Sequence, residues 1–128
     1  MTPDSTQRAA AELAGVLSTD QRITIQALAD AGAGVGGLGA DLEVIRAHAA
    51  ELAGEPIGRQ RLRRVLYELG ATSTRYRGAA RRVRLASPGR PLVESRGGHG
   101  GASARRHRLT AFAGEVLAAV TQAQEVNA

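Results

Sequence analysis

The stretch EPIGRQRLRRVLYELGATSTRYRG, residues 55–78, carries the strongest structural signal in this 128-residue chain. Its apolar residues Leu62, Val65, Leu66 and Leu69 follow the i, i+3, i+4, i+7 spacing of one helix face. Pro56 and Gly58 precede this pattern and Gly70 follows it, in positions typical of helix boundaries. The stretch therefore predicts an amphipathic helix over 59–69 and a tight turn over 70–73.

The same spacing predicts further helices on both sides of this stretch. They are expected over 3–17, from 19 or 20 to 31, over 41–53, from 72 or 73 to 85, and over 110–126. Ser18 and Gln21 have the form of a capping box, and Asp41 is suited to cap the helix that Gly54 ends. The inward faces predicted for the first three are Ala10, Leu13, Ala14 and Leu17; Ile23, Ala27, Leu28 and Ala31; and Leu42, Ile45, Ala49 and Leu52.

The composition favours packed helices over a β-sandwich. Hydrophobic residues make up 43% of the chain, many of them alanine, and aromatic residues only 2%. There is no cysteine, which excludes disulfides, thiolate zinc sites and cysteine nucleophiles. Because no apolar run approaches the ~20 residues of a membrane span, and no signal peptide is evident, we expect a cytoplasmic protein. The composition and the predicted helices together favour a mainly α fold.

The charge is divided unevenly along the chain. Residues 1–55 carry a net charge of −5, residues 56–108 hold fourteen arginines and two glutamates, and residues 109–128 carry −2. The middle segment alone therefore has a net charge of +12. Polyanions are the natural partners of such a segment.

Two glycine-rich stretches interrupt the helices. Residues 32–39 predict a turn or linker, and residues 86–108 form either a hairpin or an arm that stays disordered in isolation. The hairpin would pair residues 91–94 with residues 105–109. We accordingly expect three units: an N-terminal helical pair with linker (1–39), a basic domain with an arginine-rich arm (40–108), and a C-terminal helix (109–128).

No group of residues predicts catalysis. His48, His99 and His107 stand without partners at metal-ligand or triad spacing, so we expect them to be exposed to solvent. A G-x-G-x-x-G pattern at Gly32 follows a predicted helix, whereas dinucleotide binding requires a preceding strand. Acidic residues are scattered singly. We therefore expect a non-enzymatic protein without cofactor or metal.

The order of elements over residues 41–108 resembles the winged helix-turn-helix family of DNA-binding proteins. Residues 54–66, GEPIGRQRLRRVL, look like the entry to its second helix, and residues 67–74, YELGATST, like the turn into its recognition helix. Similar segments occur in regulators of actinobacterial plasmids and phages. The resemblance covers about half of the chain and implies a helix-turn-helix bundle with a small β-hairpin wing.

This resemblance implies that helix 73–85 enters the major groove of DNA. On a helical wheel, Arg77, Arg81 and Arg84 form one solvent-facing ridge, and Thr74 and Arg75 lie in the first turn. Arginines before this helix would contact the DNA backbone, and those of the arm would follow phosphates or probe the minor groove. The predicted DNA-binding residues are Arg59, Arg61, Arg63, Arg64, Thr74, Arg75, Arg77, Arg81, Arg84, Arg96, Arg105, Arg106 and Arg108.

The C-terminal helix carries a heptad-like seam of Leu109, Phe112, Val116, Ala119, Ala123 and Val126. This seam either docks onto its own domain or pairs with a second copy as a homodimer. The leading hypothesis is a nucleoid-associated transcriptional or replication regulator of a mobile element that binds double-stranded DNA. The alternative is a phage head or tail component, located in the virion, whose arm orders against assembly neighbours. RNA binding is weaker because the chain lacks an aromatic stacking platform.

Overall fold

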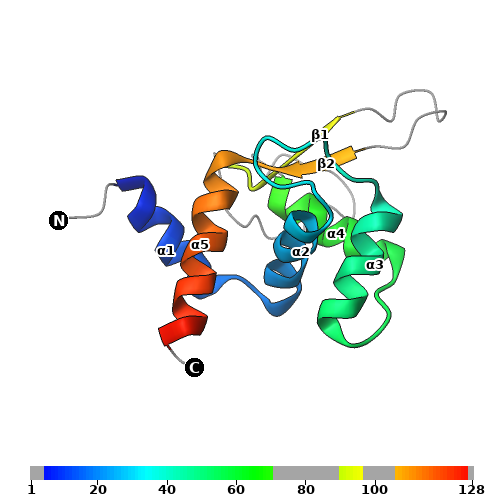
Figure 1. The fold of residues 1–128 in the computed structure, drawn as a ribbon, viewed down its shortest axis with the longest axis horizontal. Coiled ribbons are helices and arrows are strands. Elements are labelled where there is room, and N and C mark those ends of the chain that lie inside the picture. The colour runs from blue at the N-terminus through cyan, green and yellow to red at the C-terminus, as the bar shows by residue number, and fades with distance from the viewer. Residues whose placement is uncertain (1–4, 71–89, 97–105, 127–128) are drawn as a thin grey trace, which may run out of the picture.

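The computed structural model describes residues 5–70, 90–96 and 106–126, and these residues form a mainly helical fold with one antiparallel hairpin. Figure 1 shows α5 beside α1 at one side, α3 at the other, and α2 between them with the hairpin above. The elements are α1 (Ser5–Val16), α2 (Thr19–Asp30), α3 (Leu42–Ala53), α4 (Arg59–Gly70), β1 (Val93–Arg96), β2 (Arg106–Leu109) and α5 (Ala111–Val126). The predicted fold class is confirmed.

Helix α1 and the junction with α2 form as their local sequence predicts. The predicted inward residues Ala10, Leu13 and Ala14 of α1 are all buried, and so is Leu17, which follows the helix. The Ser18 hydroxyl accepts from the Gln21 backbone N–H at 3.1 Å, and the Gln21 side chain accepts from the Ser18 N–H at 3.0 Å. This capping box satisfies two helix N–H groups that would otherwise lack partners.

Helix α2 buries a wider surface than a single stripe. Ile25 and Leu28 are fully buried, and Thr24 is also buried, with its hydroxyl donating to the Asp20 carbonyl. The predicted inward residues Ile23 and Ala31 are only half-buried. Both residues still pack against the core, and α2 buries more than the predicted stripe because it contacts α3, α4, α5 and β2.

Helices α3 and α4 follow each other across a short connection, residues 54–58. Asp41 caps α3 by accepting from the Val44 N–H, and Gly54 ends it in the left-handed conformation, as predicted. Leu52 is 44% exposed rather than inward, because the last turn of α3 leads into the exposed residues 54–56. In α4 all four predicted stripe residues, Leu62, Val65, Leu66 and Leu69, are buried.

The hairpin begins two residues later than the sequence predicted. Leu92 donates its N–H to the Leu69 carbonyl at the end of α4, and the Pro91 carbonyl accepts from the Thr110 hydroxyl. Residues 91 and 92 are therefore bonded to α4 and to the start of α5, and the strand pairing runs from Val93↔Leu109 to Arg96↔Arg106. The sequence left a hairpin or a disordered arm open for residues 86–108, and the structure shows a hairpin at 93–96 and 106–109.

The glycine-rich segment after α2 is bound to the free edge of β2. Ala40 and His107 exchange both backbone hydrogen bonds at 2.9 Å, and the Leu109 N–H donates to the Ala33 carbonyl. Buried residues of the predicted segments 1–39, 40–108 and 109–128 share one core, as Leu28, Leu62 and Val116 illustrate. The segment thus fastens α2 to the hairpin as well as connecting α2 to α3.

We expect Gly39→Ala to destabilise the fold by about 1–3 kcal/mol, the usual cost of a strained backbone conformation. Gly39 has a φ of +88°, and a Cβ there would lie 3.2 Å from Cβ of Arg106. Chemical denaturation measures the change. The matched control is Gly34→Ala in the same segment, where a Cβ meets nothing within 4 Å. Equal stabilities of the two variants would contradict the role given to Gly39.

Candidate nucleic-acid interface

Seven of the thirteen predicted DNA-binding residues lie in the described part of the chain. Arg59, Arg61, Arg63 and Arg64 are on α4, and Arg96, Arg106 and Arg108 are on the hairpin. Thr74, Arg75, Arg77, Arg81, Arg84 and Arg105 lie outside the described residues, as does the whole predicted helix 73–85. The described part of the candidate site therefore consists of α4 and the hairpin.

The buried stripe of α4 determines which of its side chains face outward. With Leu62, Val65, Leu66 and Leu69 against the core, the side opposite them carries Gln60 and Arg64, and Arg63 lies at the edge of that side; all three are exposed. Arg59 and Arg61 lie on the two flanks of the helix. The outward face of α4 thus begins with an uncharged amide in its first turn and continues with two arginines.

Arg61 is held by acids from other elements. Its guanidinium donates to both oxygens of the Asp20 carboxylate, at 2.6 and 2.9 Å, and Glu55 lies 3.8 Å away. The hydrogen bonds from Arg61 lower the pKa of the Asp20 carboxyl below its ordinary value, against the opposing effect of partial burial. Arg61 therefore ties the start of α4 to the start of α2, and its charge is already neutralised.

Arg59 belongs to a second group of ion pairs, which fixes the connection between α3 and α4. Its Nε lies 2.6 Å from one oxygen of Glu43, whose other oxygen accepts from Arg46 at 2.8 Å. Arg46 also donates through Nε to the Ile57 carbonyl at 3.0 Å. The group joins the first turn of α3, the connection and the first residue of α4, so it orients one helix relative to the other.

Arg63 and Arg64 form no salt bridge with an acid among the described residues. The nearest influence is Glu68, one turn after Arg64. Burial raises the pKa of the Glu68 carboxyl, and the charge of Arg64 opposes part of that shift. Arg63 and Arg64 thus differ from Arg59 and Arg61, each of which forms a salt bridge with an acid of another element.

The arginines of the hairpin also differ in whether an acid pairs with them. Near its base, Arg108 stands opposite Glu94, donates to it at 2.8 Å, and also reaches the Gly37 carbonyl at 3.4 Å. Two residues further out, Arg96 and Arg106 stand directly opposite each other, and both are exposed. Like charges in directly opposed positions of a ladder destabilise it, so this pair favours an anionic partner.

The histidines are less exposed than the sequence suggested. His48 is half-buried on α3 and His107 is half-buried on β2, while His99 lies outside the described residues. Nδ1 of His107 lies 2.6 Å from the Ser95 hydroxyl directly across the ladder. Both histidines therefore keep part of their surface in contact with solvent, and His107 has a side-chain partner across the ladder that no local pattern indicates.

Comparison with protein-family models, curated proteins and solved structures finds no match to this chain. Among the described residues, no group of three or more His, Cys, Asp or Glu side chains is arranged to hold a metal ion. None of the described helices is both long and apolar enough to cross a membrane.

The sequence indicated the arginines of the candidate site but not the acids that form salt bridges with some of them. Asp20, Glu43 and Glu55 all lie in the segment with net charge −5, and each contacts an arginine of the segment with net charge +12. The opposite charge of neighbouring segments was the available signal. It could not name pairs such as Asp20 and Arg61, which are 41 residues apart.

We expect Asp20→Asn to lower the melting temperature at neutral pH by a small amount, as is usual for a partly exposed ion pair. Because the folded-state pKa of Asp20 is depressed, its stabilising contribution is complete above the ordinary value of 3.8 and disappears as pH falls through the folded-state value. Thermal melts of both proteins between neutral and strongly acidic pH measure this. A difference that persists unchanged in strong acid would contradict the assignment.

Proposed function

We propose that this protein is a non-enzymatic DNA-binding protein that engages double-stranded DNA through α4 and the hairpin. The observation that supports this most is that some arginines of these elements form salt bridges and others do not. Those on the flanks of α4 and at the base of the hairpin are paired with acids, whereas Arg63, Arg64, Arg96 and Arg106 are exposed without a salt bridge in the described part. Four exposed guanidinium groups without a salt bridge in the described part, on two adjoining elements, favour a polyanion.

A helix-turn-helix interpretation of α3, residues 54–58 and α4 explains why α4 carries these groups. In such a unit the first helix crosses the backbone and the second lies in the major groove. The outward face of α4 carries groups that can bind DNA in a groove. Its guanidinium groups can bind phosphate or guanine, and the Gln60 amide can bind adenine. Arg59 and Arg61, held by acids, would set the angle of the helix.

The hairpin would lie along the DNA backbone next to α4. The end of α4 is bonded to the residue before β1, through Leu92 N–H and the Leu69 carbonyl at 2.7 Å. This bond makes the hairpin and α4 one unit. Arg96 and Arg106 would then contact phosphates or enter a minor groove, which relieves their mutual repulsion.

Helix 73–85, with Thr74, Arg75, Arg77, Arg81 and Arg84, is the reading element suggested by the sequence resemblance, and Arg105 would extend the hairpin contacts. The second arrangement has α4 as the reading element, because its exposed side carries Gln60, Arg63 and Arg64. In either arrangement the protein would act as a transcriptional or replication regulator of a mobile element, located on the nucleoid. The two arrangements differ in which substitutions change sequence preference.

The first test of DNA binding is its salt dependence. If the basic surface contacts about 5–8 phosphates, log K falls with log salt with a slope of about −4.5 to −7. Fluorescence anisotropy with a labelled duplex measures this slope. A slope shallower than about −2 contradicts the proposal, and polymers or large rings formed without nucleic acid favour an assembly protein with an arginine-rich arm.

The second test separates base reading from backbone positioning, using a preferred duplex selected from a random pool. Arg64→Ala should weaken that duplex by about one to two decades and random DNA less, because a bidentate arginine–guanine contact is worth about 1–3 kcal/mol. Arg106→Ala should weaken all duplexes alike and reduce the salt slope by about one unit. Arg59→Ala is the matched control on α4, and its effect should be smaller because Glu43 already holds that side chain.

Arg77→Ala decides between the two reading elements. If α4 reads the bases, this substitution changes affinity for preferred and random duplexes by similar factors. If it alters the ratio of specific to non-specific affinity while Arg64→Ala does not, helix 73–85 is the reader and the assignment to α4 is wrong.

A further inference from the structure

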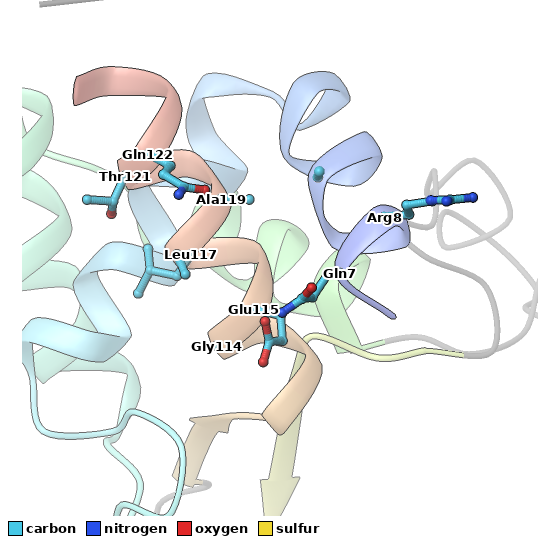
Figure 2. Close-up of a pocket in the computed structure, with 10 residues that line it drawn as sticks. Gln7, Arg8, Gly114, Glu115, Leu117, Ala119, Thr121 and Gln122 are labelled. Carbon is cyan, nitrogen blue, oxygen red and sulfur yellow. The ribbon is translucent and has the colours of Figure 1, made fainter. Parts of the chain in front are cut away.

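A groove of about 870 Å³ runs between α1 and α5, on elements that take no part in the proposed DNA contact. Figure 2 shows it, with Arg8 extending from α1 and Glu115 from α5. Its lining includes Ala11 on α1 and Gly114, Leu117 and Ala118 on α5. Ala11 and Ala118 are exposed, and Leu117 is half-buried. The groove therefore offers a small-residue, mostly apolar floor on which another helix can approach closely.

Most of the seam that the sequence suggested for dimerisation lies outside this surface, and of its residues Ala119 lines the groove. Val116 is fully buried, as are Ala113 and, nearly, Val120, because α5 packs along α1. Leu109 and Val116 of the predicted seam thus belong to the core of a single chain. The outer side of α5 is what remains for a partner, and this side carries the groove.

The charges of the groove identify the kind of partner. Arg8 stands on the α1 wall and Glu115 on the α5 wall, both exposed and neither in a salt bridge among the described residues. Opposite charges on the two walls make the surface complementary to itself. A two-fold axis through the groove brings Arg8 of each copy to Glu115 of the other, which is the arrangement an isologous dimer requires.

We propose that the α1–α5 groove is the interface of a symmetric homodimer. Apolar residues would form its centre, and the two Arg8–Glu115 pairs would form its rim. A polyanion does not suit this surface, because it carries one charge of each sign. The proposal is independent of DNA binding: it concerns other elements, and its test contains no nucleic acid.

Charge reversal tests the dimer directly, with mass measured by light scattering over a range of concentrations. The wild-type protein should have twice the 13.3 kDa mass of one chain. Arg8→Glu alone and Glu115→Arg alone each place like charges at both rim positions, so each should weaken self-association by about tenfold or more. Glu51→Arg, a charge reversal at an exposed position of α3 outside the groove lining, is the control and should leave the mass unchanged.

Mixing the two variants supplies the decisive result. In a heterodimer of Arg8→Glu with Glu115→Arg, one rim pair has the wild-type charges and the other has both charges exchanged, so both pairs attract. The mixture should regain the dimer mass that neither variant shows alone. A wild-type protein that stays monomeric, single reversals that leave the dimer intact, or a mixture that stays monomeric would each overturn the proposal. Circular dichroism of each variant confirms that the fold is retained.

Discussion

Burial of one side of α4 is the constraint on which the rest of the basic surface depends. Leu62, Val65, Leu66 and Leu69 fill the space beside α2, α3 and β1, and this fixes the rotation of the helix about its own axis. Four of the first six residues of α4 are arginines, and the rotation of the helix determines which of them face water. The apolar stripe places Arg64 opposite the core and Arg63 at the edge of that side, and it leaves Arg59 and Arg61 at the flanks.

The flanks are where the acidic first part of the chain meets the basic middle. Glu43 and Asp20 sit at the starts of α3 and α2, and each binds an arginine of the first turn of α4. Each of these exposed pairs contributes little stability by itself. Their effect is on orientation, because together with the bond from Arg46 to the Ile57 carbonyl they hold α4 from two directions. Arginines that look equivalent in the sequence are thereby divided into a salt-bridged group and an exposed group.

The sequence predicted what local interactions decide. The capping box at Ser18, the cap at Asp41 and the stripe of α4 all involve residues within one or two turns of each other, so their patterns could be interpreted directly. It did not predict what distant neighbours decide. Ile25 is buried because α2 has neighbours on several sides, and β1 starts at Val93 because Leu92 bonds to α4. The candidate site divides in the same way: the arginines were evident, and their pairing was not.

Thr110 connects the two surfaces of the protein. Its hydroxyl donates to the Pro91 carbonyl at 2.7 Å and accepts from the Ala113 N–H at 3.1 Å, and its own N–H donates to the Leu92 carbonyl. One residue therefore ends β2, caps α5 and holds the start of the hairpin. Helix α5 in turn packs along α1, so a continuous series of contacts joins the groove to the hairpin. In the proposed dimer, the spacing of the two basic surfaces would then be set by the packing at the groove, so contacts far from the DNA would determine which pairs of half-sites the protein can span.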